Sequence, residues 1–111
     1  MNLALTFGFG QVSFISGNNP LPPACNGYEQ VALLDAATNQ IPPNSVGNNP
    51  VSVATVQTSV GDGWSASADG QTWTYAYPLS ESGIEAYIQI TCPNGAVVDS
   101  QAFTLYASPP S

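Results

Sequence analysis

The chain contains no lysine, no arginine and no histidine among its 111 residues, whereas seven are aspartate or glutamate, which leaves a formal charge of −7. An average domain has about 25% charged residues of both signs. Nucleic-acid binding depends on cationic contacts to phosphate, and attraction to anionic membranes depends on basic segments. The composition therefore excludes both as partners.

Catalysis is restricted by the same absence. Without histidine or lysine, acid–base chemistry could fall only to carboxylates. Glu81 and Glu85 flank one corner, and Asp62 and Asp69 flank the segment around Trp64, so a glycosidase-like pair is conceivable. No cationic side chain exists to position a sugar, and so small a domain has no room for a deep cleft. We therefore expect a protein that is not an enzyme.

A calcium site is the better ligand hypothesis, because calcium prefers oxygen ligands. Five carboxylates lie in or near predicted turns, but EF-hand spacing is absent, and solvated turn acids are the favoured interpretation. We expect no cofactor and keep calcium as the alternative. The five are Asp62, Asp69, Glu81, Glu85 and Asp99.

Long apolar runs are also missing, so no membrane-spanning helix is predicted. The first nine residues lack the basic region of a signal peptide. Cys25 and Cys92 are the only cysteines. An even count in a small domain favours a disulfide and an oxidising compartment, with two unrelated buried thiols as the alternative.

What is present is a β pattern. Apolar residues make up 43% of the chain, and ten glycines and ten prolines fall mostly between apolar runs, as turn residues do. Asp69-Gly70 and Pro93-Asn94-Gly95 are the strongest turn signals. The predicted strands cover about 3–7, 11–15, 28–35, 51–60, 64–68, 72–77, 85–92 and 96–106.

Seven or eight short strands in one chain predict a single all-β antiparallel sandwich, with an antiparallel barrel as the alternative. We assign the domain to residues 1–107 and a tail to 108–111. Residues 1–15 form either a first strand or an assembly arm. The segment Gly17-Asn18-Asn19-Pro20 recurs as Gly47-Asn48-Asn49-Pro50, which we interpret as repeated loop chemistry and not as a duplicated unit.

Aromatic residues alternate with polar ones in the predicted strands. They could form a carbohydrate-stacking platform, but same-face alternation is more typical of a sandwich core. The candidates are Trp64, Trp73, Tyr75, Tyr77 and Tyr87.

The last third of the chain resembles bacterial and phage immunoglobulin-like modules in three short motifs. They are Asp69-Gly70-Gln71-Thr72-Trp73-Thr74-Tyr75, Ser80-Glu81-Ser82-Gly83 and Ala102-Phe103-Thr104-Leu105. The chain departs from antibody domains in having Ile90, not tyrosine, two residues before Cys92. The resemblance implies an immunoglobulin-like sandwich, with Cys25 at the start of strand B and Cys92 at the end of strand F, so that their bond staples one end.

Such modules mostly bind, space or decorate. We therefore expect a structural or interaction protein that decorates or cements a virion, a phage capsid or tail, and is oligomeric with other subunits there. Its expected location is the virion surface or the extracellular space. The alternatives are a secreted or cell-surface adhesin or carbohydrate-binding module, and an extracellular filament subunit. Candidate interaction residues are Leu3, Leu5, Phe7 and Phe9 of the N-terminal run, and Trp64.

Overall fold

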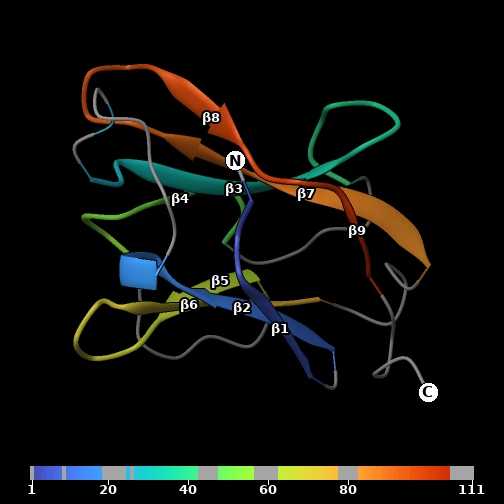
Figure 1. Cartoon of the computed structure of the whole chain (residues 1–111), viewed down its shortest axis with the longest axis horizontal. Coiled ribbons are helices and arrows are strands. Elements are labelled where there is room, and N and C mark those ends of the chain that lie inside the picture. The colour runs from blue at the N-terminus through green and yellow to red at the C-terminus, as the bar shows by residue number, and fades with distance from the viewer. Residues whose placement is uncertain are drawn as a thin grey trace.

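The computed structural model describes residues 2–8, 10–18, 25, 27–42, 48–56, 63–77 and 83–105. Two antiparallel sheets pack face to face, which confirms the all-β sandwich and not the barrel (Figure 1). The described residues form nine strands and one short 3-10 helix, η1 (Ser16–Asn18), where seven or eight strands were expected.

Sheet A has the strand order β1-β2-β6-β5. Its strands are β1 (Leu5–Gly8), β2 (Gln11–Ile15), β6 (Thr72–Ala76) and β5 (Gly63–Ala66). Sheet B has the order β4-β3-β7, and β8 and β9 both pair with the far side of β7. Its strands are β4 (Val51–Ser52), β3 (Gln30–Asp35), β7 (Ile84–Thr91), β8 (Val97–Asp99) and β9 (Phe103–Leu105).

This strand order is the A-B-E-D and C′-C-F-G arrangement of immunoglobulin-like sandwiches. It corrects one assignment, because β3 occupies the position of strand C and β2 that of strand B. The reason is direct pairing in one sheet: β3 is antiparallel to β7, with Val31 opposite Ile90 and Leu33 opposite Ile88. Strands B and F of this fold belong to opposite sheets, so β3 cannot be B.

The core lies between the sheets and follows the period-2 alternation of each strand. Ile88 and Ile90 of β7 are fully buried, as are Trp64 and Tyr75 of sheet A. The Trp64 ring lies 6.0 Å from the Phe14 ring and 5.4 Å from the Tyr75 ring. The interpretation of the aromatic alternation as core is confirmed for Trp64, Trp73, Tyr75 and Tyr77, which are all 5% exposed or less.

The last predicted strand is divided in two by a bulge. Opposite β7, Asp99 pairs with Gln89 and Phe103 pairs with Ala86, so the three residues 100–102 between these pairs face only two of β7, 87 and 88. Ser100 fills the break: its hydroxyl accepts the Ile88 N–H at 2.8 Å, and its own N–H donates to the Ile88 carbonyl at 2.8 Å. One extra residue therefore changes the register between β8 and β9.

The strand predicted over 51–60 is also shorter than expected. It ends at Ser52, because a turn follows in which the Thr55 N–H and hydroxyl both donate to the Ser52 carbonyl, at 3.1 and 3.4 Å. Residues 57–60 lie outside the described part, as do the 78–82 corner and the tail.

Gly63 marks a close approach of two backbone segments. It adopts a φ of 88°, and a Cβ built on it would lie 2.3 Å from the Asn48 nitrogen. That approach allows the Trp64 N–H to donate to the Asn48 carbonyl at 2.8 Å. The backbone at Asn48 therefore lies against β5.

We expect Gly63→Ala to destabilise the fold by about 3 kcal/mol, because it combines left-handed strain with a backbone clash. Gly70→Ala is the matched control: its φ is 73°, but nothing lies within 4 Å of the added Cβ, so about 1–2 kcal/mol is expected. Urea unfolding of both variants measures the difference. Equal losses would show that the Asn48 approach does not matter.

Candidate functional site

The outer face of sheet A is uncharged from edge to edge. Its four strands contain no aspartate or glutamate. One row of hydroxyl side chains crosses all four strands, because Thr6 pairs with Ser13, Ser13 with Thr74, and Thr74 with Ser65. The alternation that turns Phe14 and Tyr75 inward turns these short side chains outward, which leaves a flat neutral surface.

A shallow depression of about 260 Å³ lies at one end of this face. Ile15, with 45% of its surface exposed, is its largest solvent-accessible apolar residue. The lining comes from β1, β2 and β6 and the residue before β1: Ala4, Leu5, Thr6, Ser13, Phe14, Ile15 and Thr72. Such a depression can accept an apolar side chain of a partner but is no deep substrate cleft.

The carboxylates have a different distribution. Those within described strands, Asp35, Glu85 and Asp99, all belong to sheet B. Asp69 lies in the β5–β6 turn, where it accepts hydrogen bonds from the Ser67 hydroxyl and, at 3.0 Å, from the Gln71 N–H. The Ser67 hydrogen bond, followed by that of Gln71, lowers the Asp69 pKa. The predicted Asp69-Gly70 hairpin turn is thereby confirmed.

The candidate metal and catalytic carboxylates do not assemble into a site among the described residues. Within that part of the chain, no group of three acidic, cysteine or histidine residues is close enough to hold a metal ion. Asp62 and Glu81 lie outside it, so each proposed catalytic pair has one member whose position is not described.

Tyr87 is the one candidate platform aromatic outside the core. It lies on the outer side of sheet B, and its hydroxyl donates to Asn39 Oδ1 at 3.0 Å. Desolvation, with a smaller contribution from the Asp99 charge, raises its pKa. Tyr87 thus fastens the turn after β3 onto the sheet.

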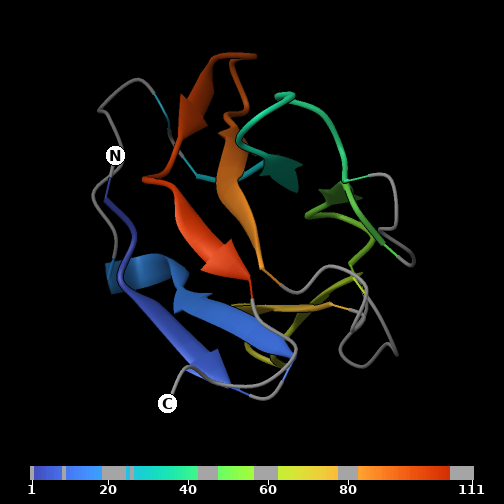
Figure 2. The same cartoon turned by 90° about the vertical axis from the view of Figure 1, so that its right-hand side faces the viewer.

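The N-terminal candidates are folded into the domain. Leu3 is 4% exposed and belongs to the core, and Leu5 is half-buried opposite Phe14. Phe7 is 39% exposed, and its ring packs edge-on against Phe103 of β9 at 5.9 Å. Figure 2 shows β1 and β2, in blue, facing the red-orange β9. Phe9 lies outside the described residues.

The structure bears on two of these interpretations. Residues 5–8 are the first strand of the protein's own sheet A and not an extended arm. The proposal of Trp64 as an interaction residue is wrong, because its side chain is fully buried between the sheets.

Two carboxamides that the sequence did not single out act as backbone clamps. Gln101 accepts the Leu3 N–H and donates to the Leu3 carbonyl, both at 2.8 Å. Asn49 does the same for Leu33, at 2.8 and 3.0 Å. Each carboxamide makes the two backbone hydrogen bonds that a residue of a neighbouring strand would otherwise make. Nothing local in the sequence predicts these contacts. The hydroxyl row was also missed, although its alternation with apolar residues in 11–15 and 72–77 was visible.

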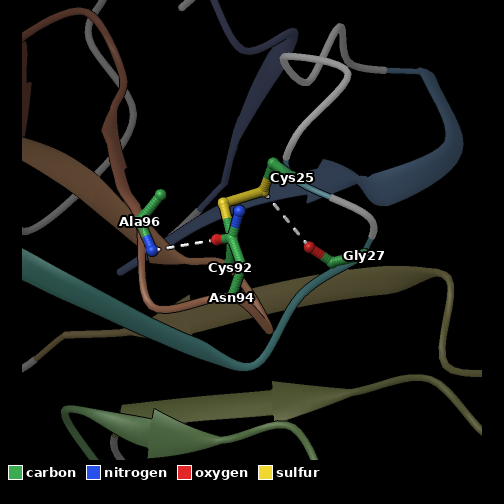
Figure 3. Close-up of a disulfide and its surroundings, with 5 residues drawn as sticks. All are labelled: Cys25, Gly27, Cys92, Asn94 and Ala96. Carbon is green, nitrogen blue, oxygen red and sulfur yellow. Dashed lines mark hydrogen bonds between the residues drawn. A yellow bond between two sulfur atoms is a disulfide. The ribbon is translucent and has the colours of Figure 1, made fainter.

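Cys25 and Cys92 form the predicted disulfide, with a Cα–Cα distance of 5.0 Å (Figure 3). Cys92 directly follows β7, and Cys25 precedes β3; the Glu29 N–H donates to the Thr91 carbonyl at 2.8 Å at the same end. The bond therefore staples one end of the sandwich, as expected, but it joins the ends of neighbouring strands of sheet B. The predicted turn at Asn94-Gly95 is confirmed, since the Gly95 N–H donates to the Cys92 carbonyl at 2.9 Å.

The chain matches no protein-family model, no curated protein and no solved structure. The resemblance to immunoglobulin-like surface modules therefore rests on the three motifs and the strand order. The described residues contain no helix long and apolar enough to cross a membrane.

Loss of the disulfide should destabilise the protein considerably. The bond spans 67 residues, and chain entropy predicts a loss of roughly 4 kcal/mol when such a loop is opened. Urea unfolding of the oxidised chain and of the Cys25→Ser/Cys92→Ser double variant measures this loss. A reducing agent should weaken the wild type and leave the variant unchanged; a wild type insensitive to reduction would contradict the pairing.

Stability should change little between pH 7 and pH 5, and below about pH 4 two opposing effects act on it. The chain has no cationic side chain for the carboxylates to pair with, so protonation of the carboxylates relieves repulsion and stabilises the fold. Asp69 acts in the opposite direction: a lowered pKa stabilises the fold above the unfolded-state value of about 3.9, and this contribution is lost as pH falls through the folded-state value.

Thermal melting of Asp69→Asn should therefore show a smaller drop below pH 4 than the wild type. Glu85→Gln removes the same charge without those turn hydrogen bonds and serves as the control. A melting temperature that collapses between pH 7 and pH 5 would overturn this account.

Proposed function

We propose that this protein is a non-enzymatic structural subunit that docks onto another protein of an extracellular assembly through the outer face of sheet A. The observation that supports this is the neutrality of that face. The core of a protein interface is depleted of charged residues, whereas solubility benefits from net charge elsewhere. Sheet A fits the first role, and the carboxylates of sheet B fit the second.

The size of the face indicates repeated weak contacts. Four strands about 4.8 Å apart and four or five residues long, at about 3.3 Å each, cover roughly 20 by 15 Å, or about 300 Å². This is below the roughly 800 Å² per partner of a standard stable interface. Many copies bound side by side on one large particle compensate for weak individual contacts through avidity. A decoration or cement protein binds its particle in this way.

We propose a virion surface, a phage capsid or tail, as the setting. The disulfide suits an oxidising exterior. The absence of lysine and arginine leaves trypsin-like proteases no cleavage site. The motifs shared with phage and bacterial immunoglobulin-like modules point in the same direction.

The two alternatives receive less support. Four of the five candidate platform aromatics are in the core, and Tyr87 is engaged by Asn39, so the described residues offer no stacking platform for a sugar. Filament growth by donation of the N-terminal run would require Leu3 and β1 to leave the domain's own core and sheet.

The test uses particles from the native source and a matched pair of variants. Mass spectrometry should find the chain in purified particles, and recombinant chain should rebind to particles stripped of it. Thr74→Glu places a charge at the centre of the sheet A face and should weaken rebinding at least tenfold, about 1.4 kcal/mol. Thr91→Glu is the same change on the outer side of sheet B, opposite Gln30, and should rebind normally.

Particles that contain none of the chain would refute the virion setting. Equal rebinding of Thr74→Glu and wild type would refute the use of the sheet A face.

A further inference from the structure

The sandwich has four sheet edges, and they are not equally protected. Sheet A ends at β1 and β5; sheet B ends at β4 and at the β8–β9 pair. An unprotected edge strand exposes unpaired N–H and C=O groups that another strand can bind. Proteins prevent this with charges, prolines, bulges, short strands or covering segments.

Three edges have such a device. On β5, the Asn48 segment forms a parallel bridge with Gly63 and accepts the Trp64 N–H. β4 is two residues long, and the Asn49 carboxamide occupies the next position along β3 by bonding both backbone groups of Leu33. These contacts leave little room for an incoming strand on either edge.

The β8–β9 edge combines three devices. It is broken by the bulge at 100–102, it carries the charge of Asp99, and Gln101 bonds both backbone groups of Leu3 across it. An added strand would have to follow a change of register and displace Leu3.

Among the residues that the structure describes, β1 shows none of the devices found on the other three edges. Its sequence, Leu5-Thr6-Phe7-Gly8, contains no charge and no proline, and its pairing with β2 is continuous from Leu5–Phe14 to Gly8–Gln11. Among the residues that the structure describes, β2 is its sole strand partner. Phe7 remains 39% exposed on this strand.

We propose that β1 pairs antiparallel with β1 of a second copy of this chain, so that two sheets A join into one. In a two-fold antiparallel pair, residues directly opposite each other must point their side chains to the same face of the joined sheet. Pairing centred on Thr6 meets this requirement and places Phe7 opposite Leu5 of the second copy. This pairing also joins the row Thr6–Ser13–Thr74–Ser65 of one copy to the same row of the second copy.

The charge distribution favours a second copy as the occupant. Two chains of charge −7 repel each other over most orientations, but all carboxylates of described strands are on sheet B. Approach through β1 brings together strands without a charge. The pairing concerns two copies of this chain alone, so it holds or fails independently of the proposed docking partner.

The ladder is short, and the dimer is correspondingly weak. A contact of this size is at the low end of protein interfaces, with a dissociation constant of about 0.1–1 mM. Because both chains are acidic, added salt should strengthen association by screening repulsion. A cationic partner would show the opposite salt dependence.

Sedimentation equilibrium from about 0.01 to 1 mM chain, spanning the expected dissociation constant, at low and high salt tests the proposal. The wild type should dimerise, more strongly at high salt. Thr6→Glu places two carboxylates opposite each other at the two-fold axis and should weaken dimerisation about tenfold. Ser65→Glu adds the same charge to the same face on the far strand β5 and should dimerise nearly as the wild type does.

Amide NMR spectra at low and high concentration provide a second measurement. Concentration-dependent shifts should concentrate at residues 5–7, and circular dichroism verifies that each variant is folded. A wild type that stays monomeric at 1 mM, or equal weakening by Thr6→Glu and Ser65→Glu, would overturn the pairing.

Discussion

The absence of cations is the constraint on which the rest of the structure depends. No carboxylate can be neutralised by a side-chain ion pair, and an unpaired buried charge is very costly. Every carboxylate must therefore remain in water or accept hydrogen bonds from neutral groups, as Asp69 does from Ser67 and Gln71. The space between the sheets is neutral as a consequence, and the disulfide is the covalent support of the fold.

Trp64 is the largest fully buried side chain of this neutral core among the described residues. Phe14 and Tyr75 of the same sheet surround its ring, and Ile88 and Ile90 close the opposite side of the sandwich. Its indole nitrogen is buried and finds no hydrogen-bond acceptor among the described residues. That unpaired donor costs free energy, and the ring contacts and buried area of the indole outweigh it. Gly63 is part of this arrangement, since the Asn48 approach fixes the strand on which Trp64 lies.

Local patterns predicted the features that depend on local chemistry. The alternation around Tyr75 and Ile88 identified core faces, and Asp69-Gly70 and Asn94-Gly95 identified turns. Sheet position is a long-range property, so the sequence could not show that β3 pairs with β7. The bulge depends on one extra residue near Ser100. The burial of Trp64 agrees with the aromatic alternation and not with its choice as an interaction residue.

The two sheets thus have different physical roles although they share one core. Charge confined to sheet B and the loops keeps separate molecules apart in most orientations and leaves them soluble. The same repulsion cannot act between the strands of sheet A, because they carry none of that charge. The described strands of sheet A therefore form one side without negative charge, and this is the side on which both proposed contacts depend.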